Sequence, residues 1–251
     1  MNQYFNIEEV GERYDRYRPK VPDIAVEWLD SVCPGKHFKK GLDVTCGTGD
    51  SLKPLIRICD EVVGIDSSDE MLAIALREKL PAIKGTYFEL KKHGKFDLIS
   101  TSMAFHWFDP ELAITSYKAA SNKGAIWLIY NFSFGGHESS GAFNKWFKNL
   151  YLKKYPIPQR NRTVLKNPIR DRCLRLIKED SGWIPLEFNA ELLVGYLSTQ
   201  SNIEHALNVG CSLNEIYKFL LNELSQINLE GNFKYVYRYK IYQYLDSEEK
   251  I

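Results

Sequence analysis

Two acidic residues and two glycines in the first half of the chain have the types and spacing of a ligand pocket. Asp43 lies in the apolar run before a tight turn, Asp66 ends a second apolar run, and Gly47 and Gly49 form a Gly-x-Gly turn between them. A strand, a turn, a helix and a second strand in this order predict a βαβ unit, whose ligands bind beyond the carboxyl ends of the strands. Two acids in such a pocket suit a nucleoside that carries both hydroxyl groups and an amine.

The position of the glycines argues against a dinucleotide. In the dinucleotide fingerprint a third glycine follows the second by three residues, and that place is Leu52 here. A carboxylate at Asp43 would also repel a pyrophosphate, whereas it would attract an ammonium group, such as the one in S-adenosylmethionine. We therefore expect Asp43 to bind the methionine ammonium and Asp66 to accept hydrogen bonds from both ribose hydroxyls. The alternative is that both acids only cap helices.

Three segments, residues 42–49, 63–72 and 96–99, resemble the motifs of class I S-adenosylmethionine-dependent methyltransferases. Within this class, Tyr14–Pro19 and His106–Asp109 are similar to segments of the small-molecule branch that includes the trans-aconitate-type enzymes. The resemblance covers roughly residues 10 to 135. It implies S-adenosyl-L-methionine as cofactor and methyl transfer by in-line displacement to a small-molecule acceptor.

The predicted cofactor site takes in further residues of the turn, the strand ends and the N-terminal segment. Besides Asp43 and Asp66, we expect contacts from Arg18, Cys46, Gly47, Gly49, Ser67, Met71, Tyr87, Phe88 and Ser102. Ser67 and Met71 would flank the adenine, and Arg18 would pair with the methionine carboxylate, because a guanidinium matches a carboxylate in two hydrogen bonds. The resemblance implies that the backbone of Ser102 meets the methionine portion.

One position departs from the family pattern. Thr45 stands where these enzymes usually have their first glycine. A β-branched residue does not comfortably adopt a positive φ. We therefore predict that residue 45 is extended.

His106 is the candidate catalytic residue, because a hydroxyl acceptor must lose its proton as the methyl group arrives. A carboxylate or thiolate acceptor would need no base, and packing of His106 between the sheet and the next helix remains open. Tyr14, Trp107 and Tyr130 are candidates for an apolar acceptor pocket. The histidine and cysteine spacing predicts no metal site.

The pattern of apolar residues predicts a doubly wound α/β fold. Strands are expected at about residues 41–46, 61–66, 84–88, 96–101, 125–130, 185–189 and 233–241. Helices are expected to begin near Pro22, Leu52, Ser67 and Asp109 and to span about 142–154, 190–199 and 213–225. The alternation predicts a Rossmann-like sheet of seven strands, mostly parallel, with an antiparallel last strand and a helical insertion on the substrate side.

Two local features of the predicted helices are specific enough to test. Ser67 and Glu70 fit a capping box, and the helix that follows should turn Met71, Leu72, Ala75 and Leu76 inward. Asp109 and Pro110 fit an N-cap followed by a proline in the first turn.

Length and composition agree with one domain. The chain has 251 residues, of which 44% are hydrophobic and 26% charged. We expect an N-terminal cap over 1–40, a cofactor-binding core over 41–134, a substrate-side elaboration with the sixth strand over 135–230, and a final strand over 231–251. The basic stretch 156–180 is read as irregular and solvated, although it could attract an anionic substrate.

The net charge, the apolar segments and the cysteines limit the binding partners and the cellular location that we expect. The net charge of +1 gives no overall field for a polyanion, so nucleic acid is not expected as a partner. The start of the chain lacks the pattern of a secretory signal, and no segment is apolar enough to span a membrane. Five scattered cysteines do not form a disulfide framework. We expect a cytoplasmic monomer or homodimer.

Two other functions stay open at this stage. The pocket could serve a different nucleotide-dependent enzyme, such as an NAD(P) reductase, or it could bind an S-adenosyl compound without turnover.

Overall fold

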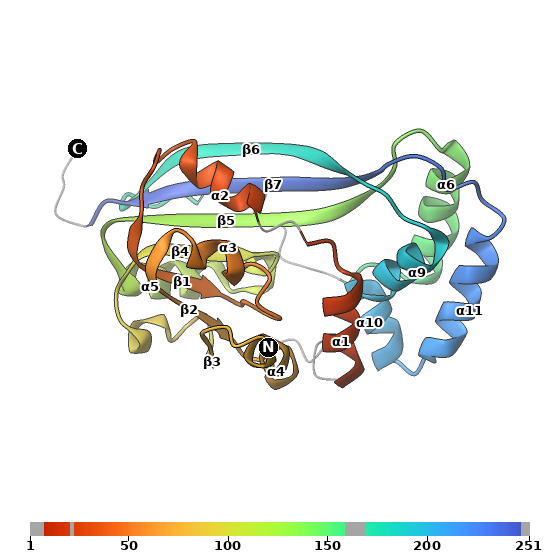
Figure 1. The fold of residues 1–251 in the computed structure, drawn as a ribbon, viewed down its shortest axis with the longest axis horizontal. Coiled ribbons are helices and arrows are strands. Elements are labelled where there is room, and N and C mark those ends of the chain that lie inside the picture. Colours follow the sequence, from red (N-terminus) through yellow and green to blue (C-terminus); the bar gives the residue numbers. More distant parts are fainter. Residues whose placement is uncertain (1–7, 21–22, 159–168, 247–251) are drawn as a thin grey trace. The chain divides into compact units, whose positions relative to one another are not determined.

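The computed structural model describes residues 8–20, 23–158 and 169–246. Its sheet contains seven strands, in the order β3-β2-β1-β4-β5-β7-β6 (Figure 1). The strands are β1 (Phe38–Val44), β2 (Cys59–Asp66), β3 (Ala82–Lys84), β4 (Phe96–Ser102), β5 (Ser121–His137), β6 (Leu174–Leu186) and β7 (Phe233–Tyr244). The first five strands pair in parallel and β7 is antiparallel, so the predicted fold class is confirmed.

Helices alternate with the strands in the first half of the chain and follow one another in the second. They are α1 (Glu8–Tyr17), α2 (Asp23–Asp30), α3 (Leu52–Ile56), α4 (Asp69–Arg77), α5 (Pro110–Ala120), α6 (Gly141–Trp146), α7 (Leu152–Lys154), α9 (Ala190–Ser198), α10 (Ser201–Asn208) and α11 (Leu213–Leu224). A π-helical turn, Phe147–Tyr151, joins α6 to α7, so the predicted helix over 142–154 is confirmed in three pieces. Helices α1 and α10 were not predicted.

The chain divides into two compact units. The core unit comprises residues 20–131, 160–181 and 238–251, and the helical unit comprises residues 1–19, 132–159 and 182–237. Of the basic stretch 156–180, residues 159–168 lie outside the described part. No helix in the described ranges combines the length and apolar character needed to cross a bilayer.

The core unit is built on the central parallel strands. Leu42, Ile99 and Trp127, from β1, β4 and β5, are fully buried, and Tyr117 of α5 packs against them. Such continuous apolar runs are typical of strands covered on both faces. The N-cap prediction for α5 is confirmed, because the Asp109 carboxylate accepts hydrogen bonds from the backbone N–H groups of the first turn.

Several local predictions in the core unit were wrong. Helix α4 is capped by Ser68 and not by Ser67, because the Asp66 carboxylate binds the Ser68 amide and delays the helix by one residue. Leu76 is 54% exposed. The apolar cluster that receives Leu72 and Ala75 is completed by Leu80, which follows the helix.

The predicted bounds of β3 and β6 also need correction. Strand β3 ends at Lys84, so the predicted 84–88 segment is mostly loop. Strand β6 begins at Leu174, well before the predicted start at Pro185. The charged residues of β6 concealed its alternation, and charge of this kind is typical of an edge strand.

The helical unit is built around aromatic side chains. Phe143 of α6 is fully buried, with its ring centroid 5.0 Å from that of Phe233 on β7. Helix α1 lies against α9 where the Tyr17 ring meets the backbone of Gly195. An ideal Cβ at Gly195 would lie 2.2 Å from Cδ1 of Tyr17, so the approach of the two helices depends on this glycine.

Gly195→Ala is therefore expected to destabilise the protein. In a free helix interior this change stabilises by about 0.5–1 kcal/mol, but the clash with Tyr17 should reverse the sign and cost about 1–3 kcal/mol. Urea unfolding measures the difference. The control is Gly141→Ala in α6, where a Cβ meets no atom within 4 Å and stability should not fall. Equal stability of Gly195→Ala and wild type would contradict the contact.

Candidate functional site

The candidate site lies in the core unit, where the strand order reverses. Strand β1 is flanked by β2 and β4, and in the pairing register Asp43 on β1 stands beside Ser100 on β4 and Gly64 on β2. In open α/β sheets, ligands bind beyond the carboxyl ends of the strands at such a reversal. The structure therefore places Asp43 where the sequence analysis expected a ligand.

The turn after β1 is fastened to the end of β2. The Cys46 amide donates to the Ile65 carbonyl at 2.9 Å, and the Gly47 amide donates to the Asp66 carboxylate at 2.9 Å. These two bonds orient the turn.

The conformation of Thr45 differs from the prediction. Thr45 has a φ of 62°, so the prediction of an extended residue 45 was wrong. The hydrogen bonds to β2 impose the left-handed conformation, and the Thr45 hydroxyl donates to the Val44 carbonyl.

The two glycines of the turn differ in the space that surrounds them. Gly47, with a φ of 56°, has no heavy atom within 4 Å of where a Cβ would stand. Gly49 has a φ of 92°, a conformation that favours glycine, and a Cβ there would lie 2.2 Å from Cδ1 of Leu80. Gly47 thus borders open space beside the acids, whereas Gly49 holds the turn against residues that follow α4.

Asp43 is a buried carboxyl group with one unused oxygen. Its Oδ2 accepts a hydrogen bond from the Ser51 hydroxyl at 2.6 Å, whereas Oδ1 accepts none of normal geometry from any described residue. Burial raises the pKa of Asp43 to about 7, the Ser51 hydroxyl opposes this rise, and the nearby Asp66 adds to it. The buried hydroxyl of Ser100 also lowers the pKa of Asp43. An ammonium group would satisfy both the charge and the free oxygen.

Asp66 links the turn to helix α4. Its two carboxylate oxygens accept backbone hydrogen bonds from Ser68 and Gly47, both at 2.9 Å. Burial raises the pKa of Asp66, and the amides of Ser68 and Gly47 oppose the rise. A carboxylate has about four acceptor sites. Asp66 therefore keeps capacity for two hydroxyl donors after both structural bonds are made.

The residues predicted beside the adenine lie in two groups. Ser67 and Met71 lie at the start of α4, where the Met71 amide donates to the Ser68 hydroxyl at 3.3 Å. Tyr87 stacks on Phe108 with ring centroids 4.1 Å apart, and its hydroxyl accepts from the Asp109 amide at 3.1 Å. Tyr87 thus has a packing role, whereas Phe88 is 47% exposed.

The candidate catalytic segment follows β4. Ser102 ends this strand and pairs in register with Tyr130 on β5. His106 lies in a short 3-10 helix, Phe105–Trp107, where it is 6% exposed with its ring centroid 4.8 Å from that of Trp107. Tyr130 is buried edge-on against Trp28. His106, Trp107 and Tyr130 all belong to the core unit.

Two predicted residues belong to the other unit. Tyr14 and Arg18 lie in the helical unit, where the Arg18 guanidinium stands 4.8 Å from the centre of the Tyr14 ring.

Sequence reasoning missed Ser51 and Ser100, the two hydroxyl residues beside Asp43. Ser100 could have been found from the predicted strands, since β1 and β4 are neighbours in a doubly wound sheet and the register places it beside Asp43. Ser51 carried no recognisable signal. All five cysteines are free thiols, and the described residues contain no cluster of three acids, histidines or cysteines that could hold a metal ion.

Comparison with known proteins identifies the segment that contains this site. Residues 42–122 match the family model of the methyltransferase domain. An uncharacterised methyltransferase of Mycobacterium tuberculosis is 32% identical over 47% of this chain and 49% of its own length. The trans-aconitate 2-methyltransferase of Deinococcus radiodurans is 30% identical over 32% of each chain. The chain thus spans about half the length, or less, of these curated relatives.

Solved structures extend the likeness to the whole fold. A candidate type II methyltransferase from Anaeromyxobacter dehalogenans aligns with a TM-score of 0.65 over 91% of this chain and 98% of its own, at 19% identity. Phosphoethanolamine N-methyltransferase 2 of Haemonchus contortus, in complex with phosphomonomethylethanolamine and S-adenosylhomocysteine, aligns with a TM-score of 0.52 over 98% of this chain and 61% of its own, at 14% identity. The resemblance to class I methyltransferases is confirmed.

The left-handed conformation of Thr45 makes it a strained position. A side chain with a Cβ in this conformation costs about 1–2 kcal/mol relative to glycine. Thr45→Gly is therefore expected to raise the free energy of unfolding in urea by up to about 1 kcal/mol, because the more flexible unfolded chain offsets part of the gain. Thr45→Ala, which keeps the Cβ, should show no gain. If both variants were equally stable, residue 45 would not be strained.

Asp43 should make the ligand-free protein less stable as the pH rises. The folded chain holds the Asp43 proton up to a pKa of about 7, whereas the unfolded chain releases it near pH 4. This contribution is present below pH 4 and is lost as the pH rises to about 7, by up to about 4 kcal/mol. We expect the free energy of unfolding to fall from pH 5 to 8, and to fall less in Asp43→Asn.

The comparison of wild type with Asp43→Asn separates the contribution of Asp43 to the pH dependence from that of other acids. Burial also raises the pKa of Glu204 to about 7, so this acid contributes a slope of the same sign in both proteins. Equal slopes in wild type and Asp43→Asn would mean that Asp43 is ionised in the folded protein throughout this range.

Proposed function

Because residues 42–122 form a methyltransferase domain, we propose that the chain binds S-adenosyl-L-methionine and transfers its methyl group to a small-molecule acceptor. The observation that carries the proposal is the buried Asp43 carboxyl with its unused Oδ1, at the strand reversal and close to the open turn at Gly47. This arrangement suits a cationic amine, which a nicotinamide dinucleotide does not offer at its pyrophosphate.

Each residue of the core-unit site has a proposed task. Asp43 binds the ammonium group, and Asp66 accepts hydrogen bonds from the two ribose hydroxyls. The open side of Gly47 admits the ligand to the backbone, while Cys46 and Gly49 hold the turn in shape. Ser67, Met71 and Phe88 border the adenine with Tyr87, and the backbone of Ser102 faces the methionine portion.

When bound, S-adenosylmethionine would supply a methyl group on a positively charged sulfur: an acceptor lone pair would form a bond to the methyl carbon as the carbon–sulfur bond breaks in line, and the sulfur would leave as a neutral thioether. The protein contributes by positioning the reactants, which can lower a barrier by about 7–11 kcal/mol in favourable cases. The deeply buried acids support this task, because hydrogen bonds and packing fix their positions before a ligand arrives.

The acceptor side is proposed to include His106, Trp107 and Tyr130 in the core unit. His106 would remove the proton from a hydroxyl acceptor, whereas a carboxylate acceptor would need no base. Tyr14 is the fourth candidate for acceptor contact. The Deinococcus and Haemonchus relatives are named for action on trans-aconitate and phosphoethanolamine, and these names favour a small molecule as acceptor here.

The ribose assignment of Asp66 provides the direct test. Asp66→Asn should weaken the binding of S-adenosylhomocysteine about 10- to 100-fold in calorimetry, because hydrogen bonds to a charged group contribute about 1.5–3 kcal/mol. NADPH should not raise the melting temperature of the wild type in the same buffer.

The matched control is Asp97→Asn. Asp97 lies at the start of β4, at the other end of the strand from Ser102, and accepts the Lys40 amide at 3.0 Å and the Asn122 side chain at 2.9 Å. Its substitution should leave nucleoside affinity unchanged. Full affinity in Asp66→Asn would refute the ribose assignment, and stabilisation by NADPH alone would refute the proposed cofactor.

A further inference from the structure

Met103, in the core unit, is a methionine in a backbone conformation that favours glycine. It follows the end of β4 and has a φ of 55°. In this left-handed region a Cβ crowds the backbone, whereas glycine adopts the conformation without strain. Three other non-glycine residues in the described ranges have a positive φ: Thr45, Lys79 and Asp246. Strained residues of this kind cluster at active sites and ligand-binding segments.

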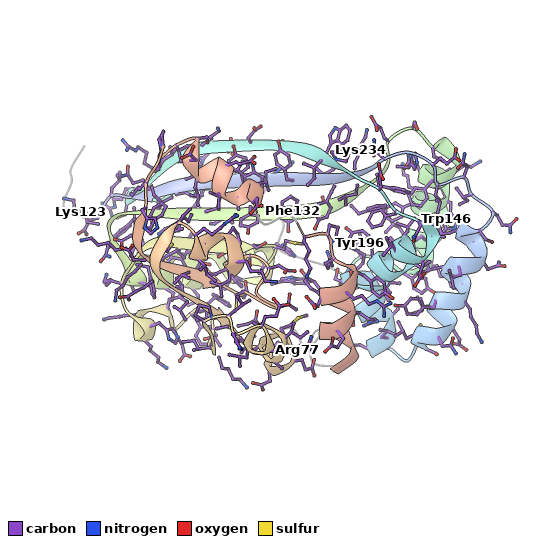
Figure 2. All side chains as sticks on the ribbon, viewed as in Figure 1. Arg77, Lys123, Phe132, Trp146, Tyr196 and Lys234 are labelled. Atoms are coloured by element: carbon purple, nitrogen blue, oxygen red, sulfur yellow. The ribbon has the colours of Figure 1, made fainter. Side chains whose placement is uncertain are left out.

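Lys79 shows the ordinary use of this conformation. It comes after α4, whose last residue, Arg77, is labelled in Figure 2. The Lys79 amide donates to the Leu76 carbonyl at 2.9 Å. The next amide, that of Leu80, donates to the Ala75 carbonyl at 3.0 Å. A left-handed residue with such hydrogen bonds is a common end of an α-helix, so the helix end explains the φ of 59° at Lys79.

Thr45 and Met103 instead follow two neighbouring strands. Thr45 follows β1 and Met103 follows β4, and these strands pair in parallel where the strand order reverses. Asp43 stands beside Ser100 in the register, so Met103 lies three residues further toward the carboxyl end of β4. Ligands bind beyond this end of the strands. Both strained residues therefore lie at the edge of the sheet where the ligand is proposed to bind.

The backbone hydrogen bonds of this segment do not require a methionine. The Met103 amide donates to the Tyr130 carbonyl on β5 at 2.8 Å. The Ala104 carbonyl accepts from the Trp107 amide at 2.8 Å in the short 3-10 helix. Because both bonds use backbone atoms only, a glycine at position 103 would keep them and remove the strain. A methionine here is therefore expected to contribute through its side chain.

Met103 is only partly buried. Thr101, Phe105 and His106 are buried, whereas residues 102–104 are partly exposed. The stretch between β4 and the 3-10 helix is thus open to a ligand. A methionine side chain is unbranched, apolar and polarisable, so it adapts to the shape of a bound molecule.

We propose that the Met103 side chain contacts the sulfur and the amino-acid end of the bound S-adenosyl compound. The inference rests on the proposed function, in which the backbone of Ser102 faces the methionine portion. A polarisable thioether suits a neighbour that is a charged sulfonium before methyl transfer and a neutral thioether afterwards. The ribose is assigned to Asp66 on β2, which lies on the other side of β1 from β4. Met103 is therefore not expected to contact the nucleoside.

Calorimetry with two ligands tests the contact. S-adenosylhomocysteine carries the sulfur and the amino-acid end, whereas adenosine has the same nucleoside without them. Met103→Ala keeps the Cβ and the strained backbone but removes the thioether, so it should weaken S-adenosylhomocysteine about 5- to 10-fold through the loss of apolar contact. Its affinity for adenosine should equal that of the wild type. Met103→Leu, which keeps an apolar side chain of similar volume, should retain most of the affinity for S-adenosylhomocysteine.

Met103→Gly separates the contact from the strain. This variant also lacks the side chain, so it should lose as much affinity for S-adenosylhomocysteine as Met103→Ala does. Urea unfolding should nevertheless show that Met103→Gly is the more stable of the two, because glycine adopts the left-handed conformation without strain. A residue with a purely structural role would not lose affinity as stability rises.

The control variant is Lys79→Gly, which relieves a similar φ outside the site. It should be more stable than the wild type, because glycine is favoured at this end of a helix. It should bind both ligands with wild-type affinity.

Wild-type affinity for S-adenosylhomocysteine in both Met103→Ala and Met103→Gly would overturn the contact and leave the proposed function intact. An equal loss of affinity for both ligands would also overturn the contact, because Met103 would then support the nucleoside site through the fold. Wild-type protein that binds neither ligand would overturn the contact and the proposed function together.

Discussion

The candidate site depends on the two hydrogen bonds that Asp66 accepts from the backbone. One comes from Gly47 in the turn after β1 and the other from Ser68 at the start of α4. A single carboxylate therefore fixes two neighbouring turns relative to each other, and it does so from the end of β2. The orientation of the turn at Gly47 and the start of α4 both depend on this constraint. A ligand that also binds Asp66 meets a group whose orientation is already set.

Both units contain a charged or chargeable group whose hydrogen bonding is incomplete. In the core unit it is Asp43, whose burial raises its pKa, and in the helical unit it is Arg18. A chain selected for stability alone would pair such groups or replace them with apolar residues. Retaining such a group weakens the ligand-free protein, and in the core unit the buried Asp43 carboxyl suits a ligand that carries an amine.

The sequence was sufficient where structure depends on neighbours along the chain. The Asp109 cap, the central strands and the inward residues Leu72 and Ala75 were predicted from periodicity and capping chemistry. The sequence was insufficient where contacts between residues far apart in the chain determine the conformation. The φ of Thr45 follows from the bonds that hold its turn to β2, and the partnership of Asp43 with Ser51 and the buried surroundings of Arg18 exist only in the folded chain.

The place of β7 in the sheet has a consequence for biosynthesis. Strand β6 is an edge strand whose neighbour in the sheet is β7, and β7 begins only at Phe233, after helices α9 to α11. During translation, β6 must leave the ribosome and remain without its partner until that later strand emerges. Charge on an edge strand disfavours pairing with other chains, and β6 carries Arg175, Lys178, Glu179 and Asp180. The charged residues that obscured this strand in the sequence thus disfavour unwanted strand pairing before the sheet is complete.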